Sequence, residues 1–221
     1  MMVHAPIKRL SNEAGNQIRA PAIICSFHNV VEELVLNSLD AGADYIEVAI
    51  DMQSFSVECR DNGVGIDLCS ENGKLFGKWQ WTSKKIELSD TSIGFRGEAI
   101  AAISALSAEF GVASKCKAST FVKRGSHPVY FSEGINQWQS GTIVKAGNVY
   151  GSLQVRQKSM RIPKEIARVK EFFQKMCLLH HRVSLSLFDF QVTQGPHRII
   201  RSKTLFRQSE QESVSSMFRS F

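Results

Sequence analysis

Two glycine-centred turns are the features of this sequence best suited to chemistry. The first is Asp61-Asn62-Gly63-Val64-Gly65, and the second is Gly94-Phe95-Arg96-Gly97. Because glycine has no side chain, it lets backbone N–H groups approach a phosphate closely. A nucleotide is therefore the first ligand class to consider.

The common phosphate-binding loops do not fit this sequence. A Gly-Lys pair occurs at Gly77-Lys78, but Asn72 stands where a P-loop has its first glycine. Trp79 stands where a P-loop has the hydroxyl residue that holds Mg²⁺. No G-x-G-x-x-G string is present either. Any nucleotide site must therefore be of another kind.

A helix is predicted from Phe27 to Ala41, because its apolar residues recur at helical spacing and Gly42 provides a C-terminal stop. At about 100° per residue, Glu33, Asn37 and Asp40 fall within one narrow stripe opposite the apolar face. The helix therefore gathers its polar groups on one side.

The remaining pattern predicts a layered α+β domain. Two alternating stretches, 46–50 and 55–59, predict an antiparallel hairpin with one buried face. A long loop is predicted from Val64 to Ser92, and long loops in compact domains are usually lids or binding loops. Helices are also predicted at 96–107 and 163–179, and strands at 109–114, 119–123, 129–131, 142–145 and 183–190. From Gln191 the pattern decays into polar and basic residues.

Composition limits the classes of protein to consider. The 221 residues carry 27 Lys and Arg against 21 Asp and Glu, a formal charge of +6, and 43% are hydrophobic, enough to bury a core. No apolar run approaches the ~18 residues of a membrane span, and the five cysteines are scattered without a C-x-x-C pair. These features predict a soluble protein without disulfides or structural zinc, with a modest preference for polyanionic partners.

Four motifs follow one another in a characteristic order. They are Asn37-Ser38-Leu39-Asp40-Ala41, Asp61 to Ile66, Thr82-Ser83-Lys84, and Gly94 to Ala99. In this order they resemble the GHKL ATPases (gyrase, heat-shock chaperones, histidine kinases and MutL), and specifically the MutL mismatch-repair family, from about Ile7 to Phe190. Leu36, where most members have glutamate, makes the chain most similar to the third eukaryotic MutL homologue. The resemblance implies a GHKL-type (Bergerat) fold, a two-layer sandwich of a mixed β-sheet and helices.

The resemblance also implies ATP and Mg²⁺ as cofactors and assigns roles to the motif residues. Glu33 would be the catalytic base that activates water, since a carboxylate one turn from a metal ligand can hold water against a γ-phosphate. Asn37 would bind Mg²⁺ through its amide oxygen. Asp61 would accept a hydrogen bond from the adenine amino group, while Gly63 and Gly65 would let the backbone turn beneath the base. Thr142, after Gly141, matches a strand residue near the adenine pocket.

Residues of the predicted loop and of the second glycine turn would surround the triphosphate. Thr82 and Lys84 lie where the family forms its nucleotide lid, with Lys84 near phosphate. Gly94, Phe95, Arg96 and Gly97 precede a helix whose N-terminus favours anions through its dipole and free N–H groups.

Each of these residues also has an ordinary structural explanation. Glu33 and Lys84 could be solvated side chains, Asn37 a surface or capping residue, and Thr142 a β-branched strand residue. The Asp61 string could be a simple turn, and the second glycine pair loop punctuation. The basic residues Arg156, Lys158, Arg161, Lys164, Arg168 and Lys170 could contact DNA phosphates or form a solvated helix face. His180 and His181 are adjacent and make a poor metal pair.

The chain departs from the family pattern in two places. Residues 148–158 lack the proline and one arginine of the D-L-F-x-x-x-P-A/V-R-R-K element, and Lys78-Trp79-Gln80-Trp81 is unusual before Thr82. We also expect an ATPase domain at 1–200 and an incomplete start of a transducer domain at 201–221, with the endonuclease region of some members absent. Such a truncated chain would hydrolyse ATP slowly.

The leading hypothesis is a nuclear MutL-type ATPase module of DNA mismatch repair. ATP and Mg²⁺ would couple nucleotide state to dimerisation with another MutL homologue and to engagement of mismatched or branched DNA, in mismatch repair and meiotic recombination. The alternative is a truncated, non-catalytic module that binds DNA or a MutL partner without turnover. Another GHKL branch, such as a kinase or chaperone domain, is a more distant alternative.

Overall fold

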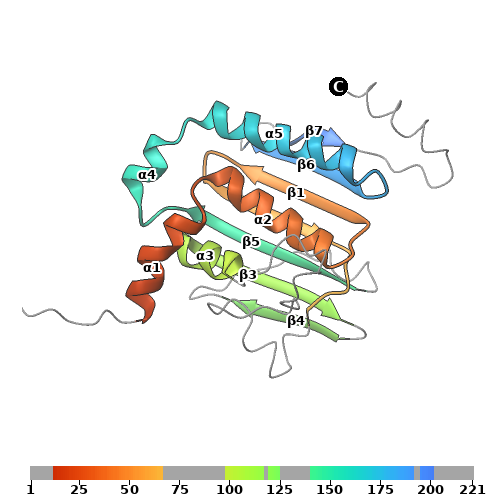
Figure 1. The fold of residues 1–221 in the computed structure, drawn as a ribbon, viewed down its shortest axis with the longest axis horizontal. Helices are drawn as coiled ribbons and strands as arrows, with labels where there is room; N and C mark the ends of the chain where they lie inside the picture. Colours follow the sequence, from red (N-terminus) through yellow and green to blue (C-terminus); the bar gives the residue numbers. More distant parts are fainter. Residues whose placement is uncertain (1–11, 67–97, 117–118, 125–139, 192–194, 202–221) are drawn as a thin grey trace, which may run out of the picture.

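The structure, a computed structural model, describes residues 12–66, 98–116, 119–124, 140–191 and 195–201 (Figure 1). The helices of these ranges are α1 (Asn12–Ile23), α2 (Phe27–Asp40), α3 (Ala99–Leu106), α4 (Gln154–Ser159) and α5 (Ile162–Leu179). The strands are β1 (Tyr45–Asp51), β2 (Ser56–Asp61), β3 (Ser107–Cys116), β4 (Ser119–Arg124), β5 (Gly141–Val149), β6 (Ser184–Gln191) and β7 (Gly195–Arg201). The predicted α+β class is confirmed.

The strands of the described ranges form one seven-stranded sheet in the order β4-β3-β5-β2-β1-β6-β7. Neighbouring strands pair antiparallel except β1 and β6, which are parallel, so the sheet is mixed. Helices α2, α3 and α5 lie across one face of the sheet (Figure 1). This arrangement is the predicted two-layer sandwich.

The core lies between these helices and the sheet. On β1, Ile46, Val48 and Ile50 are buried while the residues between them are only partly buried, so one face of the strand packs inward. Phe172 and Phe173 of α5 are buried and pack edge to face. Each such apolar side chain stabilises the fold by about 1.5–3 kcal/mol.

Most predicted elements lie within a few residues of the observed ones. The helix predicted from Phe27 is α2, the helix predicted from Pro163 is α5, and the predicted hairpin is β1 and β2. Helix α3 begins at Ala99, later than the predicted 96. The predicted strand 129–131 and residues 67–92 of the predicted loop lie outside the described residues.

No strand was predicted in the polar and basic stretch after Gln191, but Gly195–Arg201 forms β7 and pairs antiparallel with β6. β7 lies at the edge of the sheet, where a strand needs one hydrogen-bonded neighbour and tolerates a proline such as Pro196. Helices α1 and α4 were not predicted. Gly15 and Pro21 weaken the helical signal in α1, and α4 is six residues long.

No helix in the described ranges is both long and apolar enough to cross a membrane. Cys25, Cys59 and Cys177 are free thiols. The described part of the chain holds no group of three or more His, Cys, Asp and Glu side chains that could bind a metal ion, and His180 and His181 form none.

Candidate functional site

Three polar residues form a row across the ends of three adjacent strands. Asp61 of β2 is paired with Thr142 of β5, and Thr142 is paired with Ser114 of β3. Directly opposed residues of antiparallel strands place their side chains on the same face. All three are buried, at 5%, 6% and 0% exposure respectively. The next row of paired residues on the same face is also buried, and it carries no charge at neutral pH. It consists of Cys59, Val144 and Val112.

Asp61 is a buried carboxylate supplied with hydrogen-bond donors. Its Oδ1 accepts the backbone N–H of Gly63 at 2.9 Å, and its Oδ2 accepts the hydroxyl of Ser38 at 3.0 Å. Burial raises the pKa of Asp61 from its ordinary 3.8 to about 6, while hydrogen bonds from Gly63, Ser38 and the Thr142 backbone act in the opposite direction. At neutral pH the group is therefore mostly an ionised acceptor.

The turn after Asp61 is shaped by close backbone contacts. A Cβ on Gly63 would lie 2.9 Å from both the Cβ and the carbonyl oxygen of Ala41, so only glycine fits there. Gly65 has φ +75°, in the left-handed region. The N–H of Val64 bonds the Ala41 carbonyl at 3.1 Å, and the N–H of Ile66 bonds Ser114 Oγ at 2.6 Å. The turn is thus fastened to α2 on one side and to β3 on the other.

Helix α2 carries both Glu33 and Asn37. Both side chains are half-buried, and they stand one helical turn apart. Ser38, which follows Asn37, is the residue that bonds Asp61. The structure therefore places the amide of Asn37 on the turn of α2 that contacts the buried carboxylate, with Glu33 one turn earlier.

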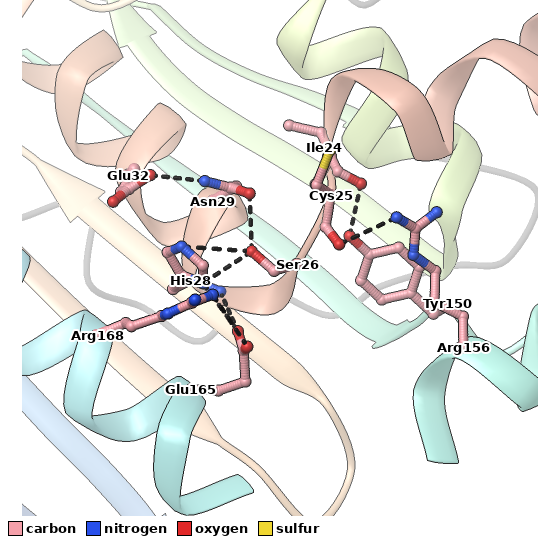
Figure 2. A network of polar contacts seen from close by, with 10 residues as sticks. All are labelled: Ile24, Cys25, Ser26, His28, Asn29, Glu32, Tyr150, Arg156, Glu165 and Arg168. Carbon is pink, nitrogen blue, oxygen red and sulfur yellow. Dashed lines mark hydrogen bonds and ion pairs between the residues drawn. The ribbon is translucent and has the colours of Figure 1, made fainter. Parts of the chain in front are cut away.

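The N-terminus of α2 is held by a residue of α5 (Figure 2). Ser26, at the N-cap, makes no capping bond and instead donates its hydroxyl to Asn29 Oδ1 at 2.7 Å. Glu165, 5% exposed, accepts the backbone N–H of His28 at 3.0 Å and lies 3.0 Å from His28 Nδ1. A carboxylate at this position satisfies a free helix N–H and complements the helix dipole. Glu165 therefore fixes one end of the helix that carries Glu33 and Asn37.

The segment between α1 and α2 is held from the other side by Tyr150 and Arg156 (Figure 2). The Tyr150 hydroxyl donates to the Ile24 carbonyl at 2.7 Å, and Arg156 donates to the Cys25 carbonyl at 3.1 Å. The Arg156 guanidinium also lies 5.5 Å from the centre of the Tyr150 ring. Residues 148–158, which depart from the family pattern, thus still form hydrogen bonds to the segment that precedes α2.

Six of the predicted site residues lie in the described part of the chain, and hydrogen bonds and strand pairing join the elements of five of them around Asp61. Glu33 and Asn37 lie on α2, Asp61, Gly63 and Gly65 on β2 and its turn, and Thr142 at the start of β5. The others, Thr82, Lys84, Gly94, Phe95, Arg96 and Gly97, lie outside the described residues.

Sequence reasoning missed Ser38, Ser114, Asn62 and Glu165. Asn62 Oδ1 accepts the N–H groups of Asp44 and Tyr45, so it holds the start of β1 rather than facing a ligand. Ser38 belongs to a recognised motif, which is a usable signal for it. Ser114 and Glu165 carried none, because the hydrogen-bond partners of their side chains are at least 27 and 137 positions distant in sequence.

Comparisons with known proteins agree with this geometry. Residues 25–128 match the family model described as histidine kinase-, DNA gyrase B-, and HSP90-like ATPase. The ATPase domain of Aquifex aeolicus MutL complexed with ADP has the same fold, with a TM-score of 0.58 and 24% identity over 87% of this chain and 68% of that one. The N-terminal domain of a DNA repair protein gives a TM-score of 0.69 and 22% identity over 92% of this chain and 60% of that one. The chain therefore has a GHKL-class ATPase fold.

Curated relatives narrow the class. The chain is 33% identical to human DNA mismatch repair protein Mlh3 over 190 residues (82% of this chain, 13% of that protein). It is 32% identical to MutL of Crocosphaera subtropica over 191 residues (83% and 34%), and 34% identical to chicken mismatch repair endonuclease PMS2 over 211 residues (90% and 24%). Within the GHKL class, the chain is thus homologous to the N-terminal region of the MutL mismatch-repair family. The chain spans about a third or less of the length of these relatives. Because its identities to Mlh3, MutL and PMS2 are similar, assignment to the third eukaryotic MutL homologue stays a prediction.

Proposed function

We propose that this chain is a mismatch-repair ATPase module that binds ATP with Mg²⁺ and hydrolyses it slowly. The observation that carries the proposal is the hydrogen bond from Ser38 to Asp61, because it joins the helix of Glu33 and Asn37 to the polar row on the sheet. Two of the four sequence motifs named above, Asn37 to Ala41 and Asp61 to Ile66, thereby meet next to Thr142. This arrangement supports a site for a nucleotide rather than a helix end and a turn that are unrelated.

The chemistry of the described residues fits the two cofactors. Asp61 is a buried acceptor suited to an exocyclic amino group, and Gly63 lets the turn that supports this carboxylate pack closely against Ala41. Asn37 offers a hard amide oxygen, as Mg²⁺ prefers, and Mg²⁺ commonly takes its other ligands from phosphates and water. Bound Mg²⁺ would neutralise phosphate charge. Glu33, one turn from Asn37, would hold the attacking water as general base.

The remaining predicted residues would complete the phosphate end of this site. Lys84, Arg96 and Thr82 carry groups that donate to phosphate oxygens, and Gly94 and Gly97 would offer backbone N–H groups ahead of α3. The N-terminus of α3, which follows at Ala99, supplies a further partial positive charge.

Calorimetry with ATP and Mg²⁺, followed by a phosphate-release assay, tests this proposal. We expect Asn37→Ala to lose the Mg²⁺-dependent part of binding and Glu33→Ala to bind ATP but lose turnover. Glu32→Ala is the matched control, since Glu32 is the adjacent carboxylate on α2 and bonds Asn29 at 2.8 Å. A parent that binds ATP without releasing phosphate would support the non-catalytic alternative, and a parent that binds no nucleotide would refute both steps.

DNA engagement is the second part of the proposal, and it is supported by a basic pocket beside α4 and α5. Arg156, Arg161, Lys164 and Arg168 line this pocket of about 410 Å³ together with the buried Glu165. The Glu165 carboxylate lies 4.0 Å from Arg168 and already accepts from His28, so positive charge predominates. Phosphates of a DNA backbone need such charge and no base recognition.

Binding of labelled duplex and mismatched DNA at several salt concentrations tests the second part. We expect Lys164→Glu to weaken binding to both duplexes alike and to lower the slope of log affinity against log salt by about 1. Lys175→Glu is the control, because Lys175 lies on the same helix but pairs with Glu171 outside the pocket. Equal losses in the two variants would indicate a general charge effect and no pocket.

Coupling of nucleotide state to dimerisation, with another MutL homologue as partner in the nucleus, completes the proposal. It is supported by the names of the relatives, which are DNA mismatch repair proteins and a mismatch repair endonuclease. A role in meiotic recombination follows only if the subtype prediction is correct. Sedimentation of this chain with a candidate partner, with and without ATP and Mg²⁺, would test the coupling.

A further inference from the structure

Ser114 joins three separate segments at the polar row. Its Oγ accepts the N–H of Ile66 at 2.6 Å, donates to the carbonyl of Gly141 at 3.0 Å, and lies 3.1 Å from Oγ1 of Thr142. Ser114 is completely buried. Buried side-chain polar atoms are nearly always hydrogen-bonded, and the donors and acceptors of each group are known, so the direction of each hydrogen bond can be worked out.

Counting hydrogens determines the direction of the bond between the two hydroxyls. A serine hydroxyl has one hydrogen, and a carbonyl oxygen can only accept. If Ser114 donates to Gly141, the contact with Thr142 exists only when Thr142 donates to Ser114. The backbone N–H of Ile66 can only donate, so it leaves this assignment unchanged. All three contacts are therefore satisfied together only when the Thr142 hydrogen points at Ser114.

In this orientation the Thr142 hydroxyl can act only as a hydrogen-bond acceptor toward a ligand. With its hydrogen occupied, Oγ1 presents only lone pairs. Asp61, the cross-strand neighbour of Thr142, is also an acceptor when ionised. The polar side-chain atoms that Thr142 and Asp61 offer to a ligand are thus all acceptors and require a donor. A base with an exocyclic amino group supplies one, whereas a base with a carbonyl at the same position would place two acceptors against each other.

We propose that Ser114 is a specificity-determining positioning residue, which holds the Thr142 hydroxyl as an acceptor and so makes the site prefer a nucleobase with an exocyclic amino group over one with an exocyclic carbonyl. Ser114 acts through Thr142 and does not itself touch the base. The inference rests on the proposed function, because it concerns the base-binding end of that nucleotide site.

The experiment measures the dissociation constants of ATP and GTP, both with Mg²⁺, for the full 221-residue chain and for variants. In Ser114→Ala the Thr142 hydroxyl is free to rotate and can donate to a carbonyl. We expect the ratio of the GTP to the ATP constant to fall about tenfold, the value of one hydrogen bond. Thr142→Val, which removes the hydroxyl at nearly constant shape, should lower the ratio similarly, and the double variant should lower it no further.

Ser107→Ala provides the matched control. Ser107 lies on the same strand, β3, but its hydroxyl bonds the Ile103 carbonyl at 2.7 Å, away from the polar row. Its ratio should equal that of the parent. An unchanged ratio in Ser114→Ala, or equal losses of ATP and GTP affinity, would overturn the proposal and leave Ser114 with a purely structural role. If Ser114→Ala does not fold, an unchanged ratio in Thr142→Val overturns it equally.

The same measurements separate failure of this inference from failure of the proposed function. If the parent binds neither nucleotide, the nucleotide site itself is wrong and the inference fails with it. If the parent binds ATP and the variants keep its preference, only the role of Ser114 is wrong.

Discussion

Ser38 of α2 donates a hydrogen bond of 3.0 Å to the buried carboxylate of Asp61 on β2, 23 positions away in sequence. The Ser38 hydroxyl also lies 3.1 Å from the Leu34 carbonyl of its own helix, so it is shared between helix and sheet. This contact fixes the distance between the helix that carries Glu33 and Asn37 and the strand that carries Asp61. A direct hydrogen bond therefore joins the helix at the phosphate end of the proposed site to the strand at its base end.

Removing this hydroxyl should alter the titration of Asp61. Ser38 is one of three donors that lower the pKa of the carboxyl against the effect of burial. In Ser38→Ala we expect the pKa of Asp61 to rise above the parent value of about 6, so that less of it is ionised at pH 7. ATP binding at pH 7 should weaken more than binding at pH 8.5. Calorimetry at both pH values checks this, with Ser107→Ala as control, and an equal loss at both would contradict it.

The buried charge of Asp61 should make the free protein less stable at neutral pH than in mild acid. Its pKa is raised from 3.8 to about 6, so between these values the folded state binds a proton that the unfolded state does not. The stability that this proton contributes is fully present below about pH 4 and is lost as pH rises through about 6. The maximum size is about 3 kcal/mol for a shift of about two units.

Urea unfolding of the parent and of Asp61→Asn from pH 4 to 7.5 measures this term. The other carboxylates are the same in both proteins, so their contributions to the pH dependence cancel in the difference between the two unfolding free energies. We expect the parent to lose stability relative to Asp61→Asn as pH rises from 4 to 7. A difference that does not change with pH would show that the pKa of Asp61 is not raised by folding.

Much of the fold could be predicted because its main helices and central strands have strong periodicity. Helix α5 runs for 18 residues with one buried face, and β1 and β2 alternate regularly between buried and half-buried residues. β7 could not be predicted, since an edge strand need not alternate and Pro196 interrupts its pattern. Helix α1 contains Pro21 and is stabilised by packing on α3 and by burial of Ala20, which a local pattern does not reveal.

The site could be predicted only in part. Asp61, Gly63 and Thr142 stand in recognisable strings, but their arrangement depends on β5 lying between β2 and β3. That order brings Ser114 opposite Thr142 and Asp61 opposite Thr142, although the three are far apart in sequence. A serine in a strand carries no signal of such a role. Strand order is set by the packing of the whole sheet, so local patterns could not supply it.

Gly63→Ala should be strongly destabilising, although the substitution adds only one methyl group. The new Cβ would lie 2.9 Å from backbone and side-chain atoms of Ala41, which are held by the packing of α2. We expect a loss of about 2–3 kcal/mol, in the range for overpacking of a rigid site. Gly15→Ala is the contrasting variant, because a Cβ there would meet nothing within 4 Å and alanine favours the helix by about 0.5–1 kcal/mol. Thermal and urea unfolding of both variants check these opposite signs, and equal behaviour would refute the close contact at Gly63.

Glu165 should stabilise the first turn of α2 from outside the helix. Two variants can separate the contribution of its hydrogen bond to the His28 N–H from the contribution of its charge. Glu165→Ala leaves the N–H of His28 without its acceptor in a half-buried position, at a cost of about 2 kcal/mol. Glu165→Gln keeps an acceptor oxygen and should cost about 1 kcal/mol, mainly from the lost interaction with the helix dipole. Amide hydrogen exchange in residues 27–30 should be faster in Glu165→Ala than in Glu165→Gln. Glu171→Ala, which removes an exposed carboxylate of the same helix, should leave this exchange unchanged. If instead both Glu165 variants exchanged like the parent, α2 would begin without help from α5, and the contact between Glu165 and His28 would have no part in positioning Glu33 and Asn37.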